Sequence, residues 1–205
     1  MPLHGDLDLR ISKVSMEIEA SPFNTELRIQ RGELYLQHED FEKAKQDFLF
    51  CLDRKAENLW VDLGLGHSYF FLNQFDSTLY YVGAALLQDP ENLSAIELQA
   101  SSLSKLGRYC ESAAAAEKML TLGQNASPFI YLMAVNSLKN CEQSGSIAKA
   151  ISTLENGIEK MGTNAVLEHE LVILLLENHQ YEQALIWQTR LIDQSTLKIP
   201  SLMDR

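Results

Sequence analysis

The residues that come nearest to a catalytic motif are His169 and Glu170, which begin the His-Glu-x-x-His pattern of zinc proteases. The second histidine of that pattern would stand where the chain has Ile173. Gly64 and Gly66 form a Gly-x-Gly triplet, but they fall inside an expected helix and follow no strand, so they do not indicate a phosphate-binding loop. The histidines show no spacing typical of metal ligands: His4, His38, His67, His169 and His179. We therefore predict a protein that is not an enzyme and has no catalytic residues, metal site or cofactor.

The three cysteines, Cys51, Cys110 and Cys141, are too few and too scattered for a disulfide framework or a Cys-x-x-Cys metal site. They predict free thiols, which are typical of a reducing compartment such as the cytoplasm. Cys51 falls where a helix needs a small residue on its inner face, so we expect it to be buried. The N-terminus lacks the basic region and apolar core of a signal peptide. A leader removed earlier would leave no trace, however, so an exported or periplasmic protein stays open.

The chain is acidic, with 28 Asp and Glu against 17 Lys and Arg and a net charge of −11. Nucleic-acid binding requires clustered Lys and Arg, and no such cluster is present, so this class of ligand is excluded. The longest apolar run, Leu171–Leu176, is far shorter than the roughly 20 residues that cross a membrane. The acidic balance instead favours a neutral or basic segment of another protein as the partner.

The expected helices follow from a residue pattern that recurs at a spacing of 34 positions. The first copy holds Gly32, Tyr35, Phe41, Ala44, Phe48 and Cys51. The next two copies hold Gly66, Tyr69, Phe75, Thr78, Val82 and Ala85, then Ala100, Leu103, Tyr109, Ser112, Ala116 and Met119. This pattern predicts a pair of helices in each copy. One pair cannot bury its apolar face alone, so the copies are expected to stack.

A period of about 34 residues with Gly-x-x-Tyr, then Ala, an aromatic residue and the closing Pro90 resembles the tetratricopeptide repeat family. The resemblance covers most of the chain. It implies an all-α, right-handed solenoid of about five helix-turn-helix repeats plus an N-terminal helix, forming one domain over 1–205. The implied segments are a capping or partial-repeat helix at 6–21, repeats at 25–58, 59–92, 93–126, 127–164 and 165–198, and the start of a truncated sixth repeat at 199–205.

The fourth copy is irregular. Ile147, Ala150 and Leu154 match the pattern only after four extra residues, which fall around 140–146. Four residues are about one helical turn. We therefore expect either a longer first helix or a bulging loop in this repeat.

In this family the first helices of the repeats line a concave groove that holds a segment of a partner protein. The resemblance implies these peptide-binding residues: Ile29, Glu33, Leu36, Trp60, Leu63, His67, Phe70, Phe71, Glu97, Ser101, Tyr131 and Val135. The second repeat offers the richest set, because aromatic anchors dominate the binding energy of interfaces. In the alternative interpretation Phe70 and Phe71 only pack against neighbouring helices.

One binding mode of the family is not expected here. Members that hold the C-terminal carboxylate of heat-shock chaperones use Lys, Asn and Arg on successive first helices. The matching positions of this chain hold no such cation or amide: Ile29, Glu33, Gly64, Ser94 and Leu98.

The leading hypothesis is therefore a non-enzymatic scaffold that binds a peptide or helical segment of another protein in its groove. Two alternatives stay open. One is a structural spacer that associates with a second copy of itself as a homo-oligomer. The other is a targeting arm of a larger protein or enzyme complex.

Overall fold

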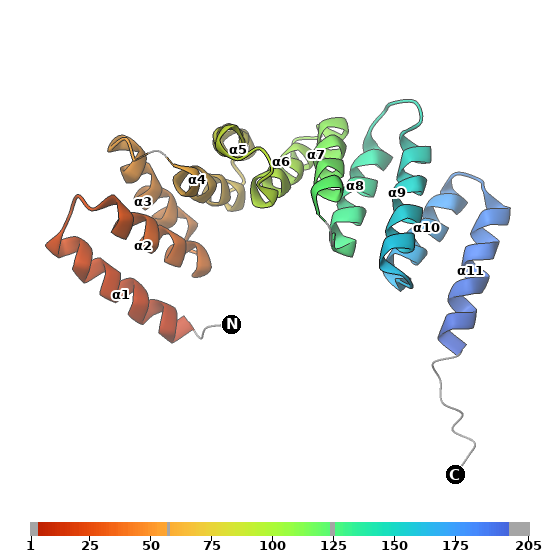
Figure 1. Ribbon diagram of the computed structural model, residues 1–205, viewed down its shortest axis with the longest axis horizontal. Helices are drawn as coiled ribbons and strands as arrows, with labels where there is room; N and C mark the ends of the chain where they lie inside the picture. Colours follow the sequence, from red (N-terminus) through yellow and green to blue (C-terminus); the bar gives the residue numbers. More distant parts are fainter. Residues whose placement is uncertain (1–3, 57, 124–125, 197–205) are drawn as a thin grey trace, which may run out of the picture. The chain divides into compact units, whose positions relative to one another are not determined.

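A computed structural model describes residues 4–56, 58–123 and 126–196, and these contain eleven α-helices and no strand. In chain order (Figure 1) the helices are α1 (His4–Ala20), α2 (Thr25–Gln37), α3 (Phe41–Asp53), α4 (Leu59–Phe71), α5 (Phe75–Gln88), α6 (Leu93–Lys105), α7 (Tyr109–Leu122), α8 (Pro128–Asn140), α9 (Ser146–Met161), α10 (Ala165–Glu177) and α11 (Tyr181–Thr196). After α1 the order of the helices gives two to each predicted repeat. The predicted all-α fold is confirmed for these residues, and the expected sixth repeat at 199–205 lies outside them.

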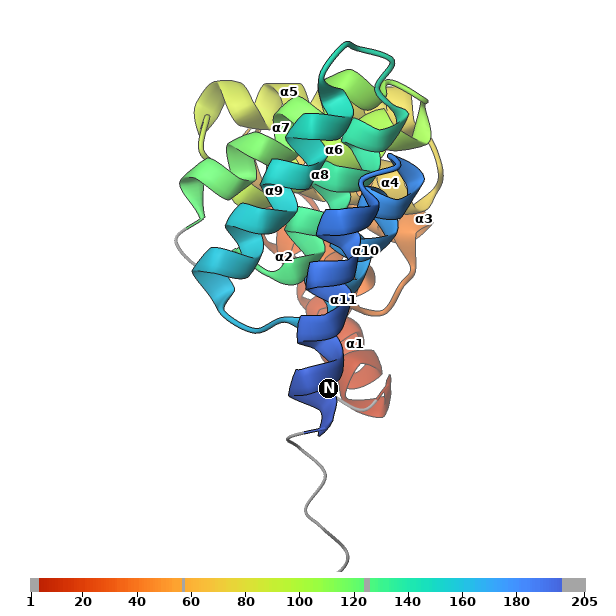
Figure 2. The same cartoon turned by 90° about the vertical axis from the view of Figure 1, so that its right-hand side faces the viewer.

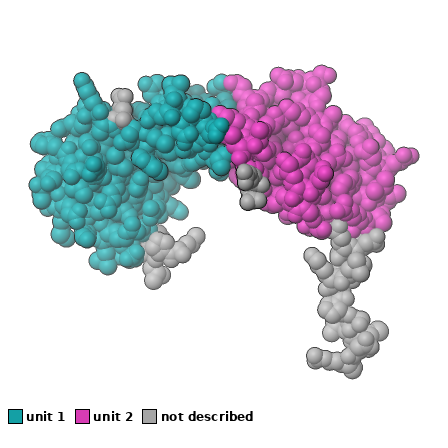
Figure 3. Space-filling model, viewed as in Figure 1, with its two compact units in different colours: residues 1–108 teal, residues 109–205 magenta. Residues whose placement is uncertain are grey.

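The helices form two compact units, residues 1–108 and 109–205, which Figure 3 shows in different colours. Unit 1 holds α1 to α6, and unit 2 holds α7 to α11. Within unit 1, α2 also contacts α4, and α4 contacts α6, so the first helices of three repeats lie side by side. Within unit 2, α8 contacts α10 in the same way, and Figure 2 shows its helices following one another. One domain extending over both units stays a prediction.

An asparagine caps the N-terminus of the first helix in four repeats. Asn58 and Asn92 accept hydrogen bonds from the backbone amides of Val61 and Ala95, at 3.0 and 3.1 Å. Asn24 and Asn164 cap α2 and α10 in the same way. A side-chain oxygen at this position satisfies amides that the first turn of a helix leaves without a partner. The capping asparagines therefore set where these first helices start.

The turn inside a regular repeat is closed by a left-handed residue. Glu39, Asn73 and His179 have φ values of 62°, 59° and 60°, and Gly107 has a φ of 75° in the same place. In each case the next amide donates to a carbonyl five residues back, at distances of 2.8 to 2.9 Å. This is the Schellman arrangement that ends many helices. The same left-handed turn therefore recurs although its residue types differ. The repeat pattern in the sequence did not reveal this backbone conformation.

Replacing Glu39 by glycine is expected to raise the free energy of unfolding by about 0.5 to 1 kcal/mol, because glycine adopts a positive φ without the Cβ clash that strains other residues. Gly107→Ala should lower it by a similar amount, since the same strain is then introduced at an equivalent turn. Urea denaturation of both variants measures the two effects. Equal stability of all three proteins would contradict this account of the turn.

The irregular fourth repeat has a longer loop. Its first helix, α8, has 13 residues, as α2, α4, α6 and α10 do. The extra residues instead form the segment between Asn140 and Ser146, where Gly145 has a φ of 87°. Of the two expected forms of this irregularity, the bulging loop is the one observed.

The core of unit 1 is built around Phe48, which is fully buried between two glycines. A Cβ added at Gly32 would lie 2.8 Å from the ring atom Cζ of Phe48, and one added at Gly64 would lie closer still. Val82 comes nearest to Gly66. Phe48 and Val82 are the large residues that lie one helical turn after Ala44 and Thr78 of the repeat pattern. Glycine is required where the ring of Phe48 meets both α2 and α4.

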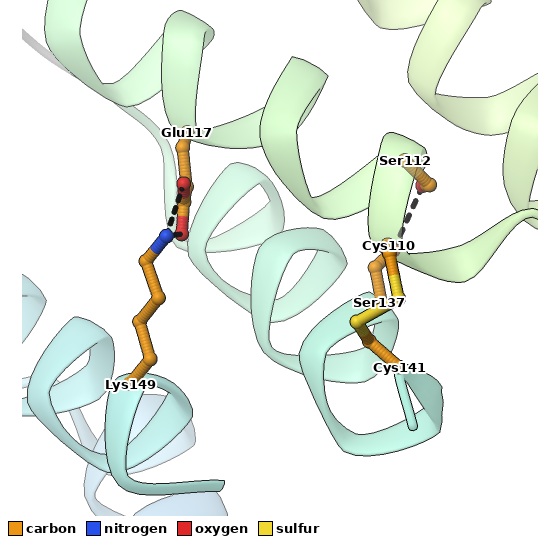
Figure 4. Close-up of a disulfide and its surroundings, with 6 residues drawn as sticks. All are labelled: Cys110, Ser112, Glu117, Ser137, Cys141 and Lys149. Atoms are coloured by element: carbon orange, nitrogen blue, oxygen red, sulfur yellow. Dashed lines mark hydrogen bonds and ion pairs between the residues drawn. A yellow bond between two sulfur atoms is a disulfide. The ribbon is translucent and has the colours of Figure 1, made fainter. Parts of the chain in front are cut away.

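The expectation of three free thiols is wrong. Cys110, near the start of α7, and Cys141, which caps the end of α8, form a disulfide with a Cα–Cα distance of 4.8 Å (Figure 4). Cys51 is free and buried, as predicted, and burial raises the pKa of its thiol to about 11. The disulfide favours an oxidising compartment over the reducing one suggested by an odd number of scattered cysteines. No helix among the described residues has the length and apolar character needed to span a membrane.

Candidate functional site

The helices of unit 1 border an open-sided cavity of about 240 Å³. Helix α4 supplies the largest share of its wall, and α2, α3 and the start of α6 supply the rest. Its lining residues are Glu33, Leu36, Phe48, Trp60, Leu63, Gly64, His67, Asn92 and Ser94. Five of the residues predicted for peptide binding, Glu33, Leu36, Trp60, Leu63 and His67, are therefore brought together by the fold.

The ring of Phe48 packs into the space that Gly64 leaves, and both residues contribute to the lining of this cavity. Leu36 and Leu63 add aliphatic surface. The cavity therefore offers a largely apolar wall to a ligand.

Trp60 and Glu33 have no partner within the described part of the chain. The side chain of Trp60 is 62% exposed, and neither a ring contact nor a hydrogen bond to its indole is present. Glu33 forms no ion pair among the described residues. An exposed tryptophan and an unpaired carboxylate that line the same cavity are unusual for a surface that serves packing alone, because aromatic side chains normally bury their area.

His67 links α4 to α6. Its Nε2 lies 3.1 Å from the hydroxyl oxygen of Ser94, the only hydrogen bond of this side chain among the described contacts. Burial lowers the pKa of His67 from the ordinary value of 6.5. The imidazole is therefore neutral at physiological pH, and it adds no positive charge to the cavity.

The lowered pKa of His67 predicts a loss of stability in mild acid. The unfolded chain takes up a proton near pH 6.5, whereas the folded chain resists it. The contribution of His67 is thus fully present above pH 6.5 and decreases as the pH falls through that value toward the folded pKa. The NMR titration midpoint of the His67 ring should lie below 6.5, and His67→Gln should flatten the stability profile between pH 7 and 5. A midpoint at or above 6.5 would contradict the burial.

Phe70 and Phe71 do not line the cavity. Phe71 stacks on Phe41 of the preceding repeat with ring centres 4.5 Å apart, and Phe70 packs edge-on against Phe75 at 5.8 Å. These contacts favour the alternative in which both residues pack against neighbouring helices. Ile29 is half-buried and packs against the core around Phe48.

The remaining predicted residues lie elsewhere. Glu97 is exposed and Ser101 half-buried on α6, and neither lines the cavity. Tyr131 and Val135 belong to α8 of unit 2, where their side chains are 3% and 1% exposed within the apolar core. Burial leaves Val135 without surface for a ligand.

Tyr131 does line a second cavity, which lies within unit 2 and which the sequence did not reveal. It has a volume of about 550 Å³ and is bordered by α7, α8 and α9. An ion pair between Glu117 of α7 and Lys149 of α9, at 2.7 Å, lies along it (Figure 4). The hydroxyls of Ser152 and Thr153 donate to the backbone oxygen of Lys149. Most of its polar lining is thus already engaged within the protein, which makes it the weaker candidate.

No group of three or more His, Cys, Asp and Glu side chains among the described residues is arranged to hold a metal ion. The lining residues that sequence reasoning did not assign to binding are Phe48, Gly64, Asn92 and Ser94. Phe48 was assigned only to the repeat pattern, and Asn92 caps the start of α6. Their place in the cavity depends on how α4 packs between α2 and α6.

No family model and no curated protein matches the sequence. Solved structures match the fold. A tetratricopeptide repeat protein from Parabacteroides merdae ATCC 43184 is 16% identical with a TM-score of 0.69, covering 92% of this chain and 73% of its own. MamA 41-end from Desulfovibrio magneticus RS-1 is 12% identical with a TM-score of 0.69, covering 86% and 97%. A further MamA structure is 16% identical with a TM-score of 0.67, covering 76% and 83%. At these identities the likeness concerns the fold, and this chain has the fold of a tetratricopeptide repeat protein.

Proposed function

We propose that this chain is a non-enzymatic scaffold that binds a segment of another protein at the cavity of unit 1. The observation that carries the proposal is the exposed, unpartnered indole of Trp60 at an apolar cavity on adjacent first helices. Tryptophan is enriched among the residues that dominate interface energies. The repeat fold supports the same conclusion, since stacked helix pairs leave an extended surface for a partner.

The size of the cavity indicates what part of a partner it accepts. A volume of about 240 Å³ suits one large side chain rather than a whole helix. The partner is therefore expected to insert one anchoring residue into the cavity at Trp60. The partner residues on either side of this anchor would lie along α2, α4 and α6.

Trp60→Ala is expected to weaken capture of the partner at least tenfold, which corresponds to about 1.4 kcal/mol or more of binding free energy. Affinity capture from cells that express the protein, quantified by mass spectrometry, measures this loss. Phe129→Ala is a matched control, because Phe129 is an equally exposed aromatic residue, on α8. Circular dichroism should show unchanged helix content in both variants. Equal capture by wild type and Trp60→Ala would refute the proposed site.

A second candidate function, assembly with another copy of the chain, is supported by α11. Leu185 and Ile186 on this helix are 66% and 69% exposed, which is unusual for neighbouring aliphatic residues on a repeat protein. Light scattering over a range of protein concentrations tests this candidate. A mass equal to that of one chain at every concentration would exclude it.

A further inference from the structure

The geometry points to an arginine side chain as the group that a partner inserts beside Trp60, with its guanidinium between the indole and the carboxylate of Glu33. This inference rests on the proposed function, because it concerns the ligand of the same cavity. Three observations support it: the charge of the lining, the shape of the lining, and the cations that contact other aromatic side chains of this protein.

Charge is the first argument. Among the described residues that line the cavity, Glu33 alone carries a full charge at neutral pH, since His67 is neutral there and none of them is Lys or Arg. Glu33 has no ion-pair partner within the described part of the chain. A cation supplied by a partner would therefore meet an available carboxylate without competing with an internal cation.

The shape of the lining is the second argument. Leu36, Leu63 and the ring of Phe48, which packs against Gly64, supply apolar wall. A long basic side chain can lay its methylene groups against such a wall while its charged end stays at the rim. Arginine suits the rim better than lysine, because the planar guanidinium stacks on an aromatic face and pairs with a carboxylate in the same plane.

The third argument is that other aromatic side chains of this protein already hold a cation. The guanidinium of Arg28 lies 4.3 Å from the ring centre of Phe50, and that of Arg54 lies 4.4 Å from Phe23. Trp187, the other tryptophan, has the guanidinium of Arg190 at 4.9 Å. Among the described residues Trp60 has no such cation over its ring, although tryptophan is the best aromatic partner for one. The cavity thus presents an aromatic ring without the cation that other aromatic rings of this chain contact.

The test begins with a display selection of random dodecapeptides against the full chain, with counter-selection against Trp60→Ala. Peptides that require Trp60 should share an arginine at one position. A synthetic peptide with citrulline there, which keeps the shape of arginine and removes its charge, should bind wild type at least tenfold more weakly. Against Glu33→Gln the two peptides should differ less than threefold. Glu159→Gln, which removes one exposed, unpaired carboxylate from α9, should retain the full tenfold difference.

The outcomes separate this inference from the proposed function. Selected peptides that depend on Trp60 but carry no basic residue, or that bind equally well with citrulline, would overturn the arginine inference and leave the scaffold function intact. Lysine at the shared position would support recognition of a cation while overturning the preference for arginine. If no peptide depends on Trp60, the proposed site fails and the inference fails with it.

Discussion

Replacing Cys110 and Cys141 together by alanine is expected to lower the free energy of unfolding of unit 2 by about 3 to 4 kcal/mol. The disulfide closes a loop over a sequence separation of 31 residues, and this loop contains almost all of α7 and α8. A covalent link of this span restricts the unfolded chain far more than the folded one, where α7 and α8 already pack together. Denaturant titration followed by hydrogen exchange at the α7 and α8 amides measures the loss.

A reducing agent provides the control for this prediction. Wild type in dithiothreitol should unfold at the same denaturant concentration as the double variant, and the double variant should not respond to the reagent. Alkylation in denaturant, read by mass spectrometry, should label one thiol without reductant and three with it, because only Cys51 is free. Three labelled thiols in the unreduced protein would show that the bond is absent.

The second large effect is expected at Asp47, whose replacement by alanine should lower the free energy of unfolding by about 3 kcal/mol. Its carboxylate is 2% exposed and lies between two arginines of α2. Arg31 donates to both oxygens at 2.7 Å, and Arg28 donates at 2.9 Å. Arg31 also donates to Ser15 of α1 at 3.1 Å, so the cluster joins the first three helices. Removing the carboxylate leaves two poorly solvated cations side by side, which costs more than the pairing itself contributes.

Asp53→Ala is the matched control for Asp47→Ala. Asp53 lies on the same helix, its side chain is 85% exposed, and its contact with Arg54 is 4.0 Å long. Exposed ion pairs contribute about 0 to 1 kcal/mol, so this variant should stay close to wild type. Replacing Arg28 and Arg31 by methionine in the Asp47→Leu background should recover much of the loss, because it removes the stranded cations. An Asp47→Ala protein as stable as Asp53→Ala would contradict the role given to the buried cluster.

The sequence predicted the helices well because their determinants are local. The predicted repeat starts at 59 and 93 coincide with the first residues of α4 and α6, Leu59 and Leu93. Apolar residues at helical spacing and a capping asparagine before the first turn act within a few residues of each other. The turn at Glu39 was less visible, because a left-handed residue that is not glycine leaves no clear pattern in the sequence.

The candidate site was predicted only in part. Trp60, His67 and Glu33 were assigned to it because the resemblance to tetratricopeptide repeats implies binding positions on the first helices. Phe71 was assigned to the same set, yet it stacks on Phe41, which belongs to another repeat. Whether an aromatic side chain faces a partner or a neighbouring helix depends on the distance between helices, which spacing alone does not give.

The sequence by itself determined the repeat period, the helix pairs and the face of each helix that must be buried. The period and the helix pairs follow from residues that recur at a spacing of 34 positions, and the buried faces follow from the spacing of apolar and polar residues within single helices. Only the tertiary structure decided that Cys110 pairs with Cys141, that Phe48 fills the space left by Gly32 and Gly64, and that a cavity stays open beside Trp60. Each of these depends on how closely residues from different helices approach one another, and the packing of all their side chains sets that approach.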